Sequence, residues 1–477
     1  MELLARCDQE PERLLAVDGS GARLTLGDLN DTAEALRAAV GGHRLVFILC
    51  ENTLCCLLEY LSCLKTGAVP LLLDARIAPH LLERLISVYH PGFFFVPGDL
   101  APGTRRAIEN ASPVLDVRDG ILLSTGQPGP ELHPELALLL TTSGSTGSPK
   151  LVRLTGRNLD ANAAAIVEYL GITEAERPIT NLMMSYSYGM SIINTHVRAG
   201  APLVLTGRGV LERAFWELME RERVTSLAGV PYTYQMFRRV GLMEMDLPCL
   251  RTLTQAGGRL PEDAHRAFAQ WAVDTGRRFF VMYGQTEAGP RMGYLPAERA
   301  LEKCGSIGIP IPGGKLCLVD GLGREISPPG ELGEIVYQGE NVALGYAETA
   351  EDLALGDQWH GRLYTGDIAR RDADGFYYIE GRKKRFIKLF GTRVNLDEAE
   401  RLVAACLPGA GAACAGRDDC LMIFLDDPSP EAGRAAVDCL SQALRFPPRV
   451  FSVQVVRAIP KNEAGKTLYA ALEQFLK

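Results

Sequence analysis

Short apolar runs alternate with longer stretches of helical periodicity along the first third of the chain. The apolar runs predict buried strands at residues 44–49, 69–74, 92–96 and 136–140. Apolar positions at helical spacing predict helices at residues 29–40 and 52–65. Because strands that alternate with helices form parallel sheets with helices packed on both faces, we expect an α/β fold.

The same alternation continues beyond residue 150 and then gives way to a β-rich segment. Further strands are predicted at residues 151–155, 201–205, 224–231, 253–256 and 279–283, with a helix at residues 158–170. Glycines and prolines then recur every few residues over residues 305–335, which is typical of short strands joined by turns. Asp374 and Gly375 predict a hairpin turn near the end of this region.

A burst of positive charge, Gly381-Arg382-Lys383-Lys384-Arg385, interrupts the β pattern. Charge runs are most often solvated linkers, so we place a domain boundary here. Beyond it, a helix is predicted to begin near Asn395, and strands follow at residues 420–425 and 451–456. The sequence therefore predicts a large N-terminal domain of layered α/β sheets with a β-rich subdomain, residues 1–381, and a small mobile α+β domain, residues 382–477.

Composition and charge exclude several classes of protein. Of the 477 residues, 47% are hydrophobic and 23% are charged, as in ordinary globular proteins. The net charge of -8 argues against general binding to nucleic acids or anionic membranes. No apolar run approaches membrane-spanning length, and the N-terminus lacks the apolar core of a signal peptide. The twelve cysteines include no C-x-x-C pair, so we expect reduced, mostly buried thiols in a cytoplasmic protein.

The first candidate site is the loop that follows the predicted strand at residues 136–140. Five hydroxyl side chains and two glycines occupy the seven residues from Thr141 to Gly147, and Lys150 follows Pro149. Backbone N–H groups, hydroxyl donors and a cation are what a polyphosphate needs from a protein. The P-loop pattern G-x-x-x-x-G-K-[ST] is missing, and composition alone would also fit a Ser/Gly-rich surface loop.

In its order of residues, this loop resembles the phosphate loop of the adenylate-forming enzymes, which include acyl-CoA synthetases, adenylation domains of peptide synthetases and luciferases. Further segments match motifs of that family in the same order along the chain: residues 283–287 (Tyr-Gly-Gln-Thr-Glu), 364–367 (Tyr-Thr-Gly-Asp), 381–385 and 460–466. The resemblance extends from about Leu24 to Lys477 and implies an acyl-adenylate-forming ligase.

The resemblance also implies which residues contact ATP and Mg²⁺. The cofactor-binding residues would be Thr142, Ser143, Gly144, Ser145, Thr146, Gly147, Lys150, Gly257, Gly258, Arg259, Tyr283, Gly284, Gln285, Asp367, Ile379 and Arg382. Among them, Tyr283 can stack on adenine, and Asp367 can accept hydrogen bonds from both ribose hydroxyls. Thr286 can donate to the α-phosphate. Glu287 can hold Mg²⁺, which favours oxygen ligands and keeps substrate phosphates among them.

The family's pocket for the carboxylic acid matches Tyr186, Ser187, Gly189 and Ala256. Synthetases that activate α-amino acids usually carry Asp where this chain has Ser187. An α-ammonium group in a buried pocket needs a carboxylate partner, because an unpaired buried charge is costly. We therefore expect an acid without an α-amino group, and the sequence leaves the identity of that acid open.

In the resembled family, the small domain rotates between two half-reactions. Lys466 matches the catalytic lysine, whose cation would stabilise the charge that builds on the α-phosphorus and the leaving pyrophosphate. Lys384 matches the hinge, and Lys388 and Gly391 match residues on the side of the thiol tunnel. Rotation about Lys384 would withdraw Lys466 and bring the Lys388 side inward.

The sequence thus predicts a ligase that converts a small carboxylic acid and MgATP to acyl-AMP and pyrophosphate, and then transfers the acyl group to a thiol. The thiol would belong to CoA or to the phosphopantetheine of a carrier protein acting in trans. Transfer to an amine, or a luciferase-like oxidation, would share all of these motifs and stays open. A non-catalytic nucleotide-binding protein would be expected to lack Glu287 or Lys466, which are both present. The sequence does not indicate the oligomeric state.

Overall fold

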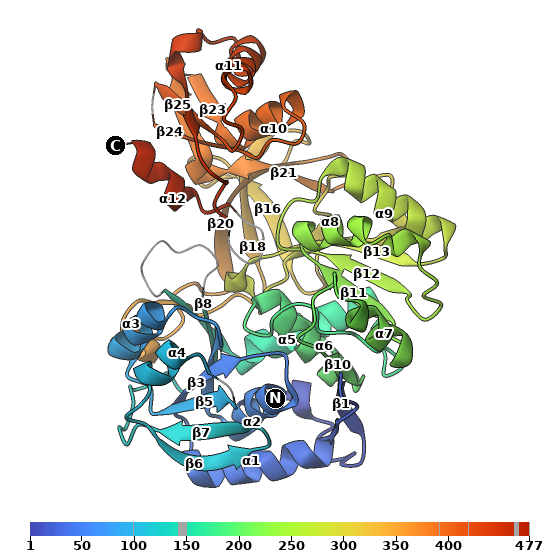
Figure 1. Ribbon diagram of the computed structural model, residues 1–477, viewed down its shortest axis with the longest axis vertical. Helices are drawn as coiled ribbons and strands as arrows, with labels where there is room; N and C mark the ends of the chain where they lie inside the picture. The colour runs from blue at the N-terminus through green and yellow to red at the C-terminus, as the bar shows by residue number, and fades with distance from the viewer. Residues whose placement is uncertain (99, 142–149, 391, 418, 462–466, 477) are drawn as a thin grey trace. The chain divides into compact units, whose positions relative to one another are not determined.

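The computed structural model describes residues 1–98, 100–141, 150–390, 392–417, 419–461 and 467–476 (Figure 1). The chain forms two compact units. The large unit comprises Met1–Leu316 and Tyr337–Leu363, and the small unit comprises Cys317–Val336 and Tyr364–Lys477. The predicted division between residues 381 and 382, with a hinge near Lys384, stays a prediction.

The large unit is built on an eight-stranded sheet with the strand order β19-β9-β8-β4-β3-β5-β7-β6. Its strands are β3 (Leu45–Cys50), β4 (Val69–Asp74), β5 (Phe93–Pro97), β6 (Ser112–Val117), β7 (Gly120–Ser124), β8 (Leu136–Thr141), β9 (Leu151–Thr155) and β19 (Gly345–Ala347). The central strands β8, β4, β3 and β5 are parallel, as predicted, whereas antiparallel strands add to both edges. The sheet is mixed because a two-residue connection such as that between β6 and β7 can join only antiparallel strands.

Both faces of this sheet are buried, as the apolar runs predict. Successive residues of β3 enter different hydrophobic clusters: Val46 and Ile48 belong to one, Phe47 and Leu49 to the other. Neighbouring side chains of a strand point to opposite faces, so each cluster fills one side of the sheet. The helices of this part of the chain are α1 (Leu26–Val40), α2 (Leu54–Thr66), α3 (Pro79–Tyr89), α4 (Pro102–Ala107), α5 (Gly156–Leu170) and α6 (Ser187–Ala199).

Local signals explain where these helices begin and end. Thr25 and Asp28 form a capping box at the start of α1, and Thr155 and Asn158 form the same arrangement at α5. Gly67 ends α2 with a φ of 83°, a left-handed conformation that glycine adopts without a Cβ penalty. Strand β9 begins directly after Lys150 and runs without a break into α5.

A second sheet of the large unit has the order β11-β12-β13-β14-β15, with β11, β12 and β13 parallel. Its strands are β11 (Ser226–Gly229), β12 (Thr252–Gln255), β13 (Arg278–Tyr283), β14 (Gly293–Leu295) and β15 (Ile309–Pro310). The accompanying helices are α7 (Arg213–Arg221), α8 (Pro231–Arg239) and α9 (Glu262–Asp274). A third, smaller sheet consists of β10 (Leu203–Leu205), β1 (Leu14–Asp18) and β2 (Arg23–Thr25).

The remaining sheets contain strands of the small unit. The β-rich segment forms a five-stranded sheet of β17 (Glu325–Ile326), β16 (Lys315–Val319), β18 (Leu332–Gln338), β20 (Arg362–Arg371) and β21 (Tyr377–Arg382). The other strands form a pair, β22 (Phe386–Leu389) with β23 (Thr392–Asn395), and a sheet of β24 (Ala412–Arg417), β25 (Cys420–Leu425) and β26 (Phe451–Val455). The helices are α10 (Leu396–Cys406), α11 (Pro430–Leu444) and α12 (Tyr469–Glu473). The predicted hairpin at Asp374 and Gly375 joins β20 to β21, and Asn395 caps α10 where the helix was expected to begin.

Within the described ranges, every helix is too short or too polar to cross a bilayer. All twelve cysteines fall inside those ranges, and each is a free thiol. Cys55, Cys56 and Cys63 are buried along α2, as the apolar pattern predicts.

Candidate active site

Two segments that are far apart in the sequence meet through their hydroxyl groups. Ser187 is the first residue of α6, and Thr286 opens the short turn η3 (Thr286–Ala288) that follows β13. The Ser187 Oγ and Thr286 Oγ1 atoms lie 3.2 Å apart in a hydrogen bond, and both side chains are buried. The predicted acid pocket and the predicted α-phosphate contact are therefore adjacent in the fold.

Tyr346 of β19 connects the predicted phosphate loop with the predicted metal ligand. Its hydroxyl donates a 2.7 Å hydrogen bond to Oε1 of Glu287. The Nζ atom of Lys150 lies 3.6 Å from the centre of the Tyr346 ring and 3.5 Å from Oε1 of Glu348. Trp359 packs edge-on against the same ring, with the ring centres 4.8 Å apart. One phenol thus orients a carboxylate and stacks beneath a cation.

Arg153 fixes the backbone around Tyr346. Its guanidinium donates to the carbonyl oxygen of Tyr346 at 3.1 Å, to those of Leu355 and Gly356, and to Oε1 of Gln358 at 2.9 Å. The Arg153 side chain is fully buried, and this desolvation lowers the pKa of the guanidinium. Because these acceptors replace the lost water, a buried cation holds β19 and the following turn in place.

Gly257 lies so close to Tyr186 that a larger residue would not fit. It has a φ of 84°, and a Cβ added to it would lie 2.5 Å from the Tyr186 hydroxyl oxygen and 3.0 Å from Cγ1 of Val230. A Cβ on Gly258 would lie 3.2 Å from the Pro231 ring. The predicted adenine wall and the predicted acid pocket are therefore in direct contact, with Ala256 buried between β12 and this turn.

Two other predicted site glycines allow backbone segments to pack closely. A Cβ on Gly189 would lie 2.1 Å from the carbonyl oxygen of Met183. A Cβ on Gly284 would lie 1.6 Å from the carbonyl oxygen of Pro290. Contacts this short are impossible for a real side chain, so both positions require glycine whether or not a ligand approaches them.

The other predicted residues of the large unit surround these contacts. Tyr283 is buried at the end of β13, and Gln285 precedes η3. Arg259 is an exposed side chain whose Nη2 lies 3.2 Å from Oε1 of Glu262 at the start of α9. Their roles toward a nucleotide stay predictions.

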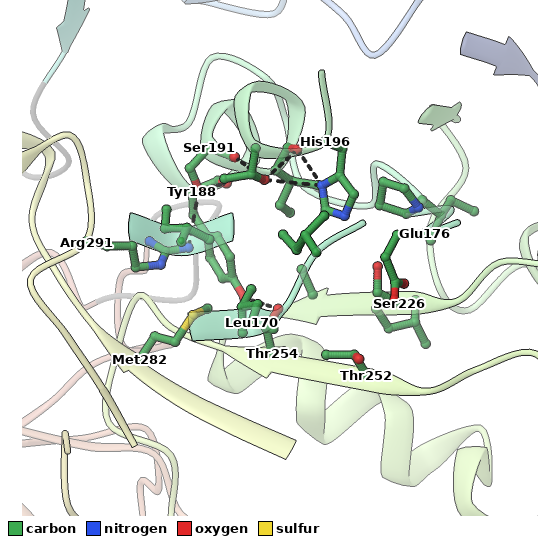
Figure 2. A pocket seen from close by; sticks show the side chains of 18 of the residues that line it. Leu170, Glu176, Tyr188, Ser191, His196, Ser226, Thr252, Thr254, Met282 and Arg291 are labelled. Carbon is green, nitrogen blue, oxygen red and sulfur yellow. Dashed lines mark hydrogen bonds between the residues drawn. The ribbon is translucent and has the colours of Figure 1, made fainter. Parts of the chain in front are cut away.

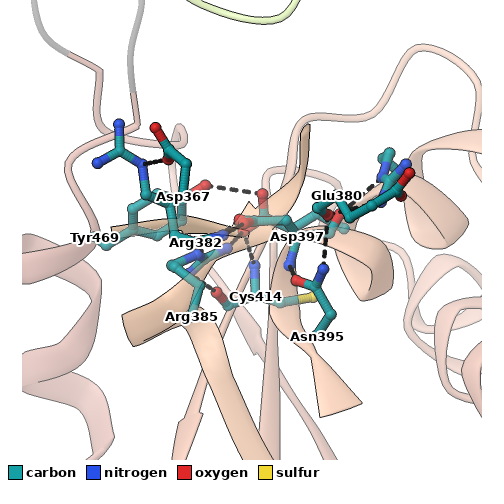
Figure 3. Close-up of polar contacts among 10 residues, drawn as sticks. Asp367, Glu380, Arg382, Arg385, Asn395, Asp397, Cys414 and Tyr469 are labelled. Carbon is teal, nitrogen blue, oxygen red and sulfur yellow. Dashed lines mark hydrogen bonds and ion pairs between the residues drawn. The ribbon is translucent and has the colours of Figure 1, made fainter. Parts of the chain in front are cut away.

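In the small unit, the predicted ribose-site residues share one hairpin (Figure 3). Asp367 of β20 and Arg382 of β21 are cross-strand partners, and Oδ1 of Asp367 lies 2.7 Å from Nε of Arg382. Asp367 is only 2% exposed, and its N–H donates to Oγ1 of Thr365 at 3.1 Å. Ile379 pairs with Ala369 in the same hairpin. A buried carboxylate is thus oriented by an exposed arginine.

The chain after this hairpin is anchored by Arg385. Lys384 lies beside it in the short turn η6 (Lys383–Arg385). The Arg385 guanidinium donates to Asp397 at 2.8 Å and to Glu400, and it stacks 3.6 Å from the centre of the Tyr469 ring (Figure 3). These contacts hold the end of the predicted linker against α10 and α12. Lys388 is exposed in β22.

Several predicted site residues lie outside the described residues. They are Thr142, Ser143, Gly144, Ser145, Thr146, Gly147, Gly391 and Lys466.

The described residues fit one kind of magnesium site. They contain no cluster of three or more His, Cys, Asp or Glu side chains that could hold a metal ion by itself. Mg²⁺ commonly binds through one or two protein carboxylates, together with substrate phosphates and water. Glu287, a half-buried carboxylate held by Tyr346, fits that donor set.

A cavity of about 40 Å³ lies between α6 and the strands β11 to β13 (Figure 2). Tyr188, Ser191 and His196 of α6 line it together with Thr254 and Arg291. Burial lowers the pKa of His196 to about 4, so its imidazole is neutral at pH 7. The space is large enough for water and is lined by both apolar and polar groups.

The sequence motifs indicate no role for Tyr346, Arg153 or Arg291. Tyr346 stands next to Gly345 in a segment that reads only as β structure. Arg291 offers a weak signal, since it is a single charge in the run Gly-Pro-Arg-Met-Gly-Tyr-Leu that follows Glu287. Nothing in the spacing of Arg153 indicates that it reaches residues 346–358.

The chain is similar in sequence to known enzymes over most of its length. The profile of the AMP-binding enzyme family matches residues 3–347. A feruloyl-CoA synthase from an Amycolatopsis species is 31% identical over 444 residues, which cover 88% of this chain and 85% of that protein. A sulfoacetate–CoA ligase from Cupriavidus necator is 31% identical over 430 residues, covering 83% of this chain and 81% of that protein.

Among solved structures, the O-succinylbenzoate coenzyme A synthetase of Bacillus subtilis in complex with ATP and magnesium ion has a TM-score of 0.78 and 22% identity, covering 99% of both chains. This likeness confirms the predicted α/β fold. The predicted class of enzyme, an acyl-CoA synthetase-like ligase, is also confirmed by the relatives in sequence. The chain therefore belongs to the AMP-binding enzyme family.

Proposed function

We propose that this protein is an ATP- and Mg²⁺-dependent acid–CoA ligase that first forms an acyl-adenylate and then an acyl-CoA thioester. The observation that carries the proposal is the contact between Ser187 and Thr286, because it brings the acid-pocket motif against the motif for the α-phosphate. The neighbouring contact between Tyr346 and Glu287 supplies an oriented carboxylate beside them. Such a site joins a carboxylate to a phosphorus atom without a nucleophile from the protein.

In the first half-reaction, a carboxylate oxygen of the acid attacks the α-phosphorus of ATP, and the bond to pyrophosphate breaks. The Thr286 hydroxyl would donate to the α-phosphate, and Ser187 would keep that hydroxyl in position. Glu287 would be the protein ligand of Mg²⁺, which when bound neutralises phosphate charge. Lys150, close to Tyr346, would supply a second cation on the phosphate side.

Residues of the small unit complete the proposal. Asp367, oriented by Arg382, would accept hydrogen bonds from the ribose hydroxyls. Lys466 would stabilise the charge that develops on the transferred phosphoryl group and on pyrophosphate. Lys384 would be the hinge at which the small domain turns before the thiol attacks the acyl carbon and AMP leaves.

CoA is the acceptor that the relatives favour, because both are named as CoA ligases or synthases. A carrier protein's phosphopantetheine offers the same thiol and is the second candidate. An amine acceptor has no comparable support among these relatives.

The test is ATP–pyrophosphate exchange across aryl, fatty, hydroxy and sulfonated acids, followed by thioester formation with CoA. We expect exchange with one class of acid and CoA-dependent release of AMP. Lys466→Ala should abolish exchange but leave the reaction of supplied acyl-AMP with CoA largely intact. Lys461→Ala, at a nearby lysine, is the matched control and should leave both reactions unchanged. Equal loss of both reactions in Lys466→Ala would contradict its proposed role.

A further inference from the structure

Arg291 is a buried cation without a carboxylate partner among the described residues. Its side chain is 3% exposed, and none of the ion pairs in the described ranges includes it. Its Nε is buried without a hydrogen-bond partner in the described part of the chain. The guanidinium lies 4.1 Å from the centre of the Tyr188 ring, and its Nη2 donates to Oγ of Ser191 at 3.3 Å (Figure 2).

The described side chains that contact Arg291 are neutral. Burial raises the pKa of the Tyr169, Tyr186 and Tyr188 phenols, so none of them ionises near pH 7. Ser191 contributes a hydroxyl only. Neutral dipoles and an aromatic face stabilise a guanidinium less than an anion would. The contacts that these side chains make with Arg291 therefore do not fully offset the cost of burying its charge.

The carboxylate that lines the same cavity is occupied elsewhere. Glu176 accepts a hydrogen bond from Thr225 and lies within 4.0 Å of Arg251 and Arg278. Thr225 and Arg251 directly precede β11 and β12, and Arg278 begins β13. No ion pair joins Glu176 to Arg291 in the described residues. The cavity therefore presents positive charge at the Arg291 end.

The position of Arg291 relative to the reacting carboxylate follows from α6. Ser187, which meets Thr286, and Ser191, which meets Arg291, are four residues apart in this helix. Side chains at that spacing lie on one face, about 5–6 Å apart at their Cβ atoms. A group bound by Arg291 would thus lie about one helical turn from the carboxylate that forms the adenylate.

We propose that the acid activated by this enzyme carries a second anionic group, a carboxylate or a sulfonate, and that Arg291 is the residue that binds it. This inference rests on the acid–CoA ligase function proposed above and narrows its substrate class. The planar guanidinium suits a carboxylate or sulfonate through paired N–H donors. The spacing along α6 favours a short acid over a long-chain fatty acid.

The charge also provides selectivity. An acid with an uncharged tail would leave Arg291 desolvated and unpaired, which is a penalty that the dianionic substrate avoids. His196 does not add a second cation at the far side of the cavity, because its imidazole is neutral there. Arg278 also lines the cavity, but it lies 4.0 Å from the carboxylate of Glu176. Among the described residues that line the cavity, selection therefore depends on Arg291.

The experiment compares dianionic acids with analogues that lack only the second charge. ATP–pyrophosphate exchange is measured for succinate, glutarate, adipate and 3-sulfopropionate, each beside a matched monoanionic analogue, such as a monomethyl ester, that keeps the reacting carboxylate. We expect kcat/KM for at least one dianionic acid to exceed that of its analogue about 100-fold. Comparable values throughout, or exchange only with the monoanionic analogues, would overturn the inference while leaving the ligase function intact. Silence with these acids, together with exchange on an aryl, fatty or hydroxy acid, would overturn the inference alone, whereas silence with both panels would overturn the ligase function as well.

Variants identify the residue. Arg291→Met should remove the preference by lowering kcat/KM for the dianionic acid, while kcat/KM for the monoanionic analogue stays the same or rises. Arg291→Lys keeps the charge and should retain part of the preference. If Arg291→Met does not fold, the shift in melting temperature of the unaltered enzyme decides: the dianionic acid should stabilise it and the ester should not, and equal shifts would refute a role for Arg291.

Discussion

The hydroxyl of Tyr346 donates a 2.7 Å hydrogen bond to Oε1 of Glu287, a residue 59 positions earlier in the chain. The same ring lies under the Nζ atom of Lys150. Tyr346 therefore connects three segments that the sequence keeps apart: the end of the predicted phosphate loop, the turn after β13 and the strand β19. Its position depends in turn on the buried Arg153, which binds the Tyr346 carbonyl.

Tyr346→Phe should weaken magnesium binding, so that more Mg²⁺ is needed for activity, without unfolding the protein. The ring would keep its contact with Trp359, while Glu287 would lose the donor that orients it. Loss of such an outer hydrogen bond typically costs about 10–100-fold in metal affinity or activity. Titrating ATP–pyrophosphate exchange with Mg²⁺ measures the change. Tyr89→Phe is the matched control, because Tyr89 donates to the carbonyl of Ala347, next to Tyr346, and does not contact Glu287.

Thr286→Val should impair adenylation far more than Ser187→Ala does. Both changes break the same hydrogen bond, but only the first removes the hydroxyl proposed to reach the α-phosphate. Valine keeps the shape of threonine and leaves the buried Ser187 hydroxyl unpaired, so unfolding free energy should also fall by about 1–2 kcal/mol. Exchange kinetics and urea unfolding of both variants separate the two effects. If both variants lost exchange activity equally, the hydrogen bond between Thr286 and Ser187 would matter and a direct contact of Thr286 with the α-phosphate would be contradicted.

Gly257→Ala should disturb the site beyond its cost in backbone strain. An alanine at a φ of 84° is strained by about 1–3 kcal/mol, and its Cβ would also press on the Tyr186 hydroxyl. Gly276→Ala is the matched control, since it has a φ of 67° and no atom within 4 Å of the added Cβ. Both variants should lose comparable stability in urea, whereas only Gly257→Ala should raise the KM for the acid. A second change, Tyr186→Phe, should recover part of that KM.

Glu59 should make the enzyme less stable as pH rises. Burial in α2 raises the pKa of this carboxyl from 4.5 to about 8, so the folded protein keeps a proton that the unfolded chain releases. Stability from this group is therefore full below about pH 4.5 and declines as pH rises toward 8, by about 1.4 kcal/mol per pH unit.

Glu59→Gln removes this titration while keeping the shape of the neutral side chain. The variant should therefore gain about 2–3 kcal/mol over the parent between pH 5.5 and 7.5, as measured by urea unfolding. Glu83→Gln, on the exposed side of α3, should run parallel to the parent over the same range. Parallel curves for Glu59→Gln as well would mean that Glu59 is ionised in the folded protein.

Elements whose apolar pattern is local and regular were predictable from the sequence. Strands β4, β9 and β25 occupy the predicted residues, because a continuous apolar run flanked by turn residues has few alternatives to a buried strand. The helix α6 was not predicted: its first turn, from Ser187 to Met190, is rich in polar and aromatic residues that read equally well as a pocket-lining loop. Tertiary packing, not local propensity, makes that segment helical.

The candidate site divides in the same way. Its ordered motifs, from the phosphate loop to Lys466, were visible in the sequence because nucleotide chemistry demands particular residue types at particular positions. Tyr346, Arg153 and Arg291 gained their roles only in the folded chain. No local pattern encodes such relations between segments: a hydrogen bond between residues 59 apart, a buried guanidinium that holds a distant turn, and a buried Arg291 Nε that has no hydrogen-bond partner in the described part of the chain. The sequence by itself determined the family and the adenylation chemistry. Only the tertiary structure decided that Arg291 is buried against Tyr188 and Ser191, because the electrostatic field in a buried pocket depends on what packs around it.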